Sequence, residues 1–223
     1  MDSQEEVRYN DQPESKGFRI AKNIFKGLLF GASAVVWVLI FWVIISTREP
    51  SFYGEMIFSE KTRAAASADE QYEVWQLHVQ TWMNYDNSIS VSGVWYAEDT
   101  GELEIGFRFN TKLTRIKDES GNSITTEPVY VLSDDAGKTY AVSNLKETVI
   151  GRYRYFRVCF SDVRLALSGG DRESQPVLRL TLTRAYDGEP LAYYYDNSGV
   201  KINDAELVIF NAETVVQKTA FES

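Results

Sequence analysis

Residues 102–110 have the sequence ELEIGFRFN, and their alternation determines the predicted fold class of the whole chain. Every second position carries a large apolar side chain: Leu103, Ile105, Phe107 and Phe109. Successive side chains of a β-strand point to opposite faces of a sheet, so one face of this segment is apolar and the other polar. We therefore predict a strand whose apolar face lies in a core and whose other face, with Glu102 and Glu104, lies in water.

Other strand-like segments lie on both sides of this one. Residues 88–97 precede it, and the connecting residues 98–101, Glu-Asp-Thr-Gly, are typical of a hairpin turn. The remaining expected strands are 73–83, 123–132, 138–142, 152–160, 176–185 and 206–210. Short strands at regular spacing, with no long amphipathic helix among them, predict an all-β, antiparallel sandwich or barrel.

The order of these segments resembles a known class of fold. The similarity is carried by GELEIGFRFNTKL (101–113), YVLSDDAGKTYAV (130–142), RYRYFRVCFSDVRL (152–165) and PVLRLTLT (176–183). In this order they resemble the immunoglobulin-like (telokin-like) β-sandwiches of exported bacterial proteins, over about residues 72–210. The resemblance implies an immunoglobulin-like sandwich over residues 72–223, and a fold alone implies no particular activity.

An uncharged stretch near the N-terminus predicts a membrane anchor. Residues 27–46, GLLFGASAVVWVLIFWVIIS, contain no charged side chain, and twenty helical residues extend over about 30 Å, the thickness of a bilayer's hydrocarbon core. A cleaved signal peptide would have a shorter apolar region that ends in a small-residue cleavage site. A core helix of a soluble domain would have a polar face. The sequence therefore favours a transmembrane helix that places residues 27–46 in the lipid bilayer.

The charges beside this span predict its orientation. Arg48 is the only basic residue close after the span, whereas four lie within residues 16–26 directly before it: Lys16, Arg19, Lys22 and Lys26. Because positive residues favour the cytoplasmic side, we expect a single-pass protein of the cell membrane with residues 1–26 as a short cytoplasmic tail. The alanine-rich, polar residues 59–71 predict a short helical or flexible segment, and with residues 47–58 they form the predicted juxtamembrane stalk over residues 47–71. Residues 72–223 would then form an extracytoplasmic domain.

The distribution of charge argues against a nucleic-acid partner. Residues 1–50 carry six basic and six acidic side chains, so the remaining residues hold 17 basic and 26 acidic groups and the whole net charge of −9. Such a domain repels phosphate backbones. The arginine- and aromatic-rich residues 152–160 are therefore expected to form a strand, with Phe156, Val158 and Phe160 in the core and Arg157 and Cys159 on the opposite face.

Few residues suit catalysis or metal binding. The chain has one histidine, His78, and one cysteine, Cys159, which excludes an intramolecular disulfide and zinc sites built from several such ligands. Three pairs of neighbouring Asp or Asn residues could contribute to a calcium site but lack the spacing of a calcium loop: Asp86-Asn87, Asp134-Asp135 and Asp196-Asn197. We therefore predict that the protein is not an enzyme, that it has no catalytic residues, and that it binds no metal or cofactor.

The tyrosine run Tyr193, Tyr194 and Tyr195 is the predicted binding site. Aromatic side chains are enriched where proteins bind partners, although tyrosine also suits half-buried strands. The leading hypothesis is an anchored sandwich that binds a protein or a glycan of the cell envelope. The alternatives are a membrane-tethered cell-wall hydrolase that uses surface carboxylates such as Glu102 and Glu104, and a sensor that signals to the tail. The identity of the partner and the oligomeric state stay open.

Overall fold

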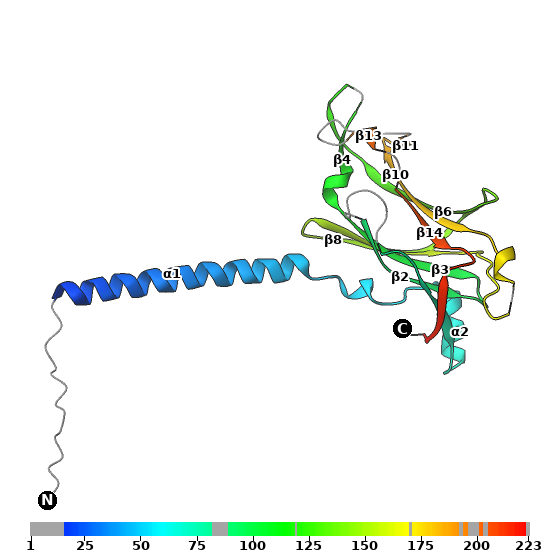
Figure 1. The fold of residues 1–223 in the computed structure, drawn as a ribbon, viewed down its shortest axis with the longest axis horizontal. Helices are drawn as coiled ribbons and strands as arrows, with labels where there is room; N and C mark the ends of the chain where they lie inside the picture. The colour runs from blue at the N-terminus through cyan, green and yellow to red at the C-terminus, as the bar shows by residue number, and fades with distance from the viewer. Residues whose placement is uncertain are drawn as a thin grey trace, which may run out of the picture. The chain divides into compact units, whose positions relative to one another are not determined.

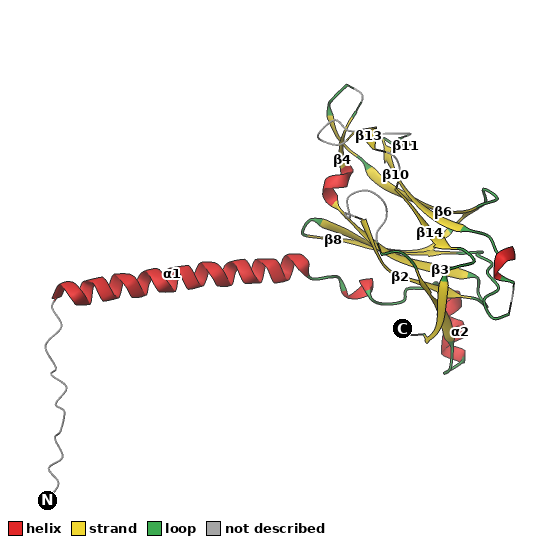
Figure 2. Cartoon of the chain, in the orientation of Figure 1, coloured by secondary structure: helices red, strands yellow, loops and turns green. Residues whose placement is uncertain are grey.

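The structure, a computed structural model, describes residues 16–81, 89–118, 120–169, 171–191, 194–195, 201–202 and 205–221 (Figure 1). The chain divides into two compact units, residues 1–47 and residues 48–223. We call the second of these the β unit, because strands dominate it (Figure 2).

Helix α1 (Lys16–Thr47) is the main element of the first unit. Its stretch Lys16–Ile45 is long and apolar enough to cross a membrane, and no part of its most apolar window is buried within the chain. Large apolar side chains are exposed along it from Phe18 to Ile45. The prediction of one N-terminal apolar helix of membrane-spanning length is therefore confirmed.

The largest sheet of the β unit, sheet A, is antiparallel throughout. Among the described residues its strand order is β15-β1-β2-β3-β9-β8. Its strands are β1 (Glu73–His78), β2 (Ile89–Ala97), β3 (Glu102–Asn110), β8 (Val142–Ile150), β9 (Tyr153–Phe160) and β15 (Val215–Ala220).

Two further antiparallel sheets complete the described part of the β unit. Sheet C has the order β11-β10-β6-β7, and β14 also pairs with β10. Its strands are β6 (Glu127–Asp134), β7 (Thr139–Tyr140), β10 (Leu178–Tyr186), β11 (Glu189–Pro190) and β14 (Ala205–Phe210). The small sheet B contains β13 (Lys201–Ile202), β12 (Tyr194–Tyr195), β4 (Arg115–Lys117) and β5 (Ser123–Thr125) in that order.

Sheets A and C share one hydrophobic core. Their facing side chains belong to a single buried cluster, in which the ring centroids of Phe107 and Phe156 lie 5.0 Å apart. Leu180 of β10 and Leu207 of β14 contribute from the side of sheet C. The apolar alternation of residues 102–110 thus predicted the inner face of sheet A correctly, and the antiparallel β architecture is confirmed.

The predicted turn between β2 and β3 is also confirmed. Gly101 has a φ of +70°, a left-handed conformation that favours glycine, and an added Cβ would come within 2.9 Å of the Val163 carbonyl oxygen. The adjacent strands pair from Ala97 opposite Glu102 to Ile89 opposite Phe109, with a bulge between Val91 and Gly93.

Several elements were not predicted. The most important is β8, whose sequence VSNLKETVI alternates poorly because most of its side chains are in contact with water. The others include short helices, which lack the length that a periodic pattern needs. They are η1 (Ser51–Tyr53), η2 (Thr111–Thr114) and η3 (Arg172–Ser174). Helix α2 (Glu60–Ala68) matches the helical alternative for residues 59–71.

The segment after α1 differs from the predicted stalk. Residues 48–71 belong to the compact β unit, and Tyr53, Ile57, Phe58 and Thr62 within them are buried. The expectation of a stalk over residues 47–71 rested on the polar, alanine-rich part of this segment. The apolar residues that fasten it lie just before that part and are too few to form a periodic pattern.

Candidate functional site

The outer face of sheet A, which points away from sheet C, is covered by residues 55–62. We call these residues the cover segment. Phe58 is fully buried there in a second hydrophobic cluster with Val74, Ala97 and Cys159. Ser59 begins α2 by accepting a hydrogen bond from the Lys61 backbone N–H through its side chain, as an N-cap residue does. Strands β3 and β9 are consequently buried on both faces.

Glu102 and Glu104 lie under the cover segment and not in water. Glu104 is 0% and Glu102 is 3% exposed. The prediction of a wet face for these two residues is therefore wrong, because alternation shows which residues share a face but not whether another segment covers it. The hydrolase alternative would require these carboxylates to be exposed at the surface. In this structure both are buried.

Both carboxylates accept hydrogen bonds from the cover segment. The Ile57 backbone N–H donates to Glu104 Oε2 at 2.7 Å. The Ser59 backbone N–H donates to Glu102 Oε2 at 3.1 Å, and the Thr62 hydroxyl donates to the same oxygen at 2.6 Å. Two residues of one strand thus hold a segment that is 40 to 47 positions away in sequence.

Arg157 of β9 completes the buried charge cluster. Its Nε lies 3.4 Å from Glu104 Oε1, both side chains are 0% exposed, and its Nη2 donates to the Glu55 carbonyl oxygen at 2.7 Å. The guanidinium carbon lies 4.0 Å from the ring centroid of Trp95. Gly106 leaves room for this side chain, since an added Cβ would lie 2.6 Å from Arg157 Nη1.

The cluster is not fully hydrogen-bonded within the described residues. Glu104 Oε1 and Arg157 Nε and Nη1 are buried without a hydrogen-bond partner there. Buried charges without full hydrogen bonding are costly, so desolvation dominates their titration. Burial raises the pKa of Glu104 to about 7, although Arg157 opposes the shift, and burial lowers the pKa of Arg157 to about 10 although Glu104 opposes it.

Cys159 lies beside the same cluster and is inert. It is fully buried, opposite Glu104 in the pairing of β3 with β9. Burial raises the pKa of its thiol to about 12. Because the thiolate is the reactive form, this cysteine is a packing residue at neutral pH.

The predicted tyrosine site is only partly described. Tyr193 lies outside the described residues, and Tyr194 and Tyr195 form β12, where the structure describes the backbone but not their side chains. Asp86, Asn87, Asp196 and Asn197 of the possible calcium sites also lie outside the described residues, and within the described ones no group of three or more potential metal ligands occurs.

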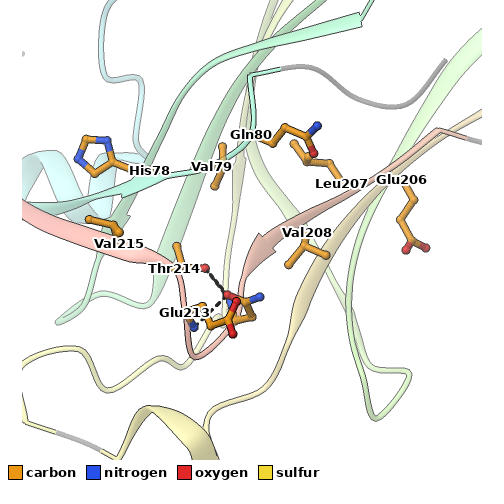
Figure 3. A pocket seen from close by; sticks show the side chains of 10 residues that line it. His78, Val79, Gln80, Glu206, Leu207, Val208, Glu213, Thr214 and Val215 are labelled. Atoms are coloured by element: carbon orange, nitrogen blue, oxygen red, sulfur yellow. Dashed lines mark hydrogen bonds between the residues drawn. The ribbon is translucent and has the colours of Figure 1, made fainter. Parts of the chain in front are cut away.

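An open groove of about 440 Å³ lies between the ends of β1 and β14 (Figure 3). His78, which the sequence singled out as the lone histidine, is one of its lining residues and is exposed. The groove mixes hydrogen-bonding and apolar side chains. They are His78, Val79, Gln80, Glu206, Leu207, Val208, Asn211, Glu213, Thr214 and Val215.

A second open surface follows strand β8 at the edge of sheet A. Among the described residues β8 pairs only with β9, so its other side is open. Val142, Leu145 and Val149 are 45%, 40% and 56% exposed, and they are three of the five exposed large apolar residues described in the β unit. Leu145 lies opposite the core residue Val158, so it points to the inner face of the sheet, where nothing covers it fully.

Comparison of the chain with protein-family models, curated proteins and solved structures finds no match. The function is therefore inferred from the geometry of the chain itself.

Proposed function

We propose that this protein is a single-pass membrane protein whose β unit, an immunoglobulin-like sandwich outside the cytoplasm, binds an extended segment of another protein of the cell envelope. The length and composition of α1 support membrane insertion. The basic residues before the uncharged stretch, Lys16, Arg19, Lys22 and Lys26, favour a cytoplasmic N-terminus.

The observation that carries this proposal is the open edge of β8. The nine residues of β8, which carry a bulge between Val142 and Asn144, leave their outer backbone groups without a strand partner among the described residues. Exposed sheet edges accept an added strand from another chain, whose backbone hydrogen bonds supply affinity. Val142, Leu145 and Val149 would supply side-chain contacts on one face.

The proposal is tested by site-specific photocrosslinking in native membranes. A photoreactive amino acid at Lys146, which is exposed on β8, should give a discrete crosslinked product. Gln217, which is exposed on the opposite edge strand β15, is the matched control position. The same photoreactive group there should give no crosslinked product.

The double substitution Leu145→Glu with Val149→Lys keeps the net charge and should abolish the product, because it places charges beside an incoming apolar strand. Val215→Glu, on the opposite edge, is the control and should leave the product unchanged. Equal products from both edges, or a product that survives the double substitution, would contradict strand addition at β8.

A glycan partner is the second candidate, and the groove at His78 favours it. Its lining offers hydrogen-bonding groups from Gln80, Asn211, Glu213 and Thr214 beside apolar Val79 and Leu207, a combination that suits a sugar ring. Cell-wall oligosaccharides titrated against the full-length protein in detergent should bind, and Gln80→Ala with Asn211→Ala should weaken that binding. No binding at millimolar oligosaccharide would exclude this candidate.

A further inference from the structure

Basic side chains gather where β3 ends and β9 begins. Asn110 of β3 pairs with Tyr153 of β9, and the Thr111 backbone N–H donates to the Arg152 carbonyl oxygen at 2.8 Å. The next turn, η2, is thereby held against the start of β9. We call the four basic residues of this end the basic tip. They are Arg108, Lys112, Arg152 and Arg154.

The basic tip has more positive charge than its carboxylate partners neutralise. Arg108 pairs with Glu49 at 2.8 Å, and Arg154 pairs with Glu147 at 3.0 Å. Lys112 and Arg152 are exposed, and neither forms an ion pair with any residue that the structure describes. Four basic and two acidic groups leave a charge of +2 here. The tip is thus positive although residues 51–223 together carry 17 − 26 = −9.

The covalent chain keeps this tip close to the end of the uncharged stretch. That stretch ends at Ser46, and Glu49, the partner of Arg108, follows three residues later. Three residues extend over at most about 11 Å. The polar layer on each side of a bilayer's hydrocarbon core is about 5–8 Å thick. With residues 27–46 in a bilayer, the length of the chain would therefore allow Arg108 to reach the lipid headgroups.

Other side chains at the basic tip also suit a membrane interface. The guanidinium carbon of Arg108 lies 5.1 Å from the ring centroid of Tyr153, which is half-buried. Val149, on the adjoining end of β8, is largely exposed. Tyrosine and arginine together are typical of the headgroup layer, where one part of a side chain meets apolar surface and the other meets water.

We propose that the basic tip binds anionic phospholipid headgroups of the membrane that α1 crosses. This proposal depends on the membrane insertion of α1 that is part of the proposed function. It assigns a ligand, the phospholipid headgroup, to a part of the β unit that is separate from the middle of β8. Its attraction is electrostatic, so it grows with the fraction of anionic lipid and is screened by salt.

The test uses the full-length protein in vesicles of phosphatidylcholine alone and of phosphatidylcholine mixed with phosphatidylglycerol. A spin label is attached to Val149→Cys, and the native thiol Cys159 does not interfere because it is buried. Asp135→Cys, in the exposed turn at the opposite end of the strands, is the control position. Relaxation of each label by nickel chelated to lipid headgroups reports its distance from the membrane surface.

The label at position 149 should be relaxed strongly in vesicles with phosphatidylglycerol, weakly without it, and weakly at high salt, whereas the label at position 135 should not respond. Lys112→Glu with Arg152→Glu should reduce the equilibrium constant for headgroup binding by more than tenfold, since one basic residue near an anionic surface raises that constant about fivefold. Arg63→Glu with Arg164→Glu changes the net charge equally at exposed positions elsewhere and should leave the relaxation unchanged.

The proposal is overturned if the label at position 149 responds equally in both kinds of vesicle, or if the two double substitutions have the same effect. Resistance of the protein to alkaline extraction is measured in the same vesicles. A protein that is extracted contradicts the membrane insertion on which both proposals depend. If the protein stays inserted but shows no lipid-dependent relaxation, only the proposal that the basic tip binds lipid headgroups is contradicted.

Discussion

Strands β3 and β9 have two faces that are equally buried and chemically opposite. The inner face presents Ile105, Phe107 and Phe156 to the core shared with sheet C. The outer face presents Glu102, Glu104 and Arg157 to the cover segment. Both sets of side chains are essentially inaccessible to water.

The difference concerns how each face is stabilised. Apolar burial is non-directional and tolerates many partners, whereas buried charges require specific donors and acceptors at fixed positions. The inner face therefore holds two sheets together, and the outer face holds one particular segment, the one that leads from α1 into the β unit.

The largest expected effect comes from removing one member of the buried pair. Glu104→Ala leaves Arg157 as a buried charge without its counterion, and loss of one partner of a buried ion pair typically costs about 3–5 kcal/mol. Phe107→Ala on the inner face should cost a similar amount, because large-to-small changes of buried aromatic residues cost about 3–5 kcal/mol. Chemical denaturation of the full-length protein in detergent measures both.

A double substitution distinguishes how the two faces are stabilised. Glu104→Leu with Arg157→Met replaces the pair by apolar side chains and should recover most of the stability lost in Glu104→Ala. No such recovery is expected for any second change beside Phe107→Ala. If Glu104→Ala proves as stable as the natural chain, the buried pair does not stabilise the outer face.

The second prediction concerns pH. The pKa of Glu104 is raised by burial to about 7 in the folded protein, against its ordinary value of 4.5, so the folded state keeps a proton that the unfolded state loses. Stability should therefore be fully present below about pH 4.5 and fall as pH rises through 7, by up to about 3 kcal/mol. Glu104→Gln should remove this slope. Stability that rises over the same interval in the natural chain but not in the variant would contradict the shift.

The inner face could be predicted from sequence and the outer face could not. The alternation in residues 102–110 identified the strand, its hairpin partner and its core side chains, because apolar burial leaves a periodic pattern. The burial of Glu104 depends on Ile57 and Arg157, which are 47 and 53 positions away by number, and no local pattern reports such contacts. Strand β8 was missed because an exposed edge strand has little apolar alternation.

The third prediction concerns the cover segment alone. Glu102→Ala removes the acceptor of the Ser59 backbone N–H and the Thr62 hydroxyl, and loss of such buried hydrogen bonds costs about 1–3 kcal/mol. We expect the cover segment and α2 to open locally while the shared core persists. Limited proteolysis should then cut near Arg63 in the variant before it cuts the strands. Simultaneous loss of both regions would mean that the cover segment is not a separate cooperative element.

The smallest effect is expected at the open edge. Leu145→Glu with Val149→Lys changes two exposed side chains, and such surface changes usually alter stability by no more than about 0.5 kcal/mol. Thermal unfolding of the variant should match that of the natural chain. A loss of several kcal/mol would show that these residues belong to the core and would weaken β8 as a binding edge.

The attachment of the cover segment is tested most directly by hydrogen exchange at the Ile57 backbone amide in the full-length protein. This N–H donates to Glu104 Oε2 at 2.7 Å, so it should exchange as slowly as the amides of β3. The amide of Gln71, which lies in an exposed turn and donates to Asp69 Oδ1 at 2.9 Å, is the reference; since this bond is open to water, the amide should exchange faster. Glu104→Ala should bring Ile57 to the rate of Gln71. An Ile57 amide that exchanges as fast as Gln71 in the natural chain would contradict the claim that buried charge holds this segment on the sheet.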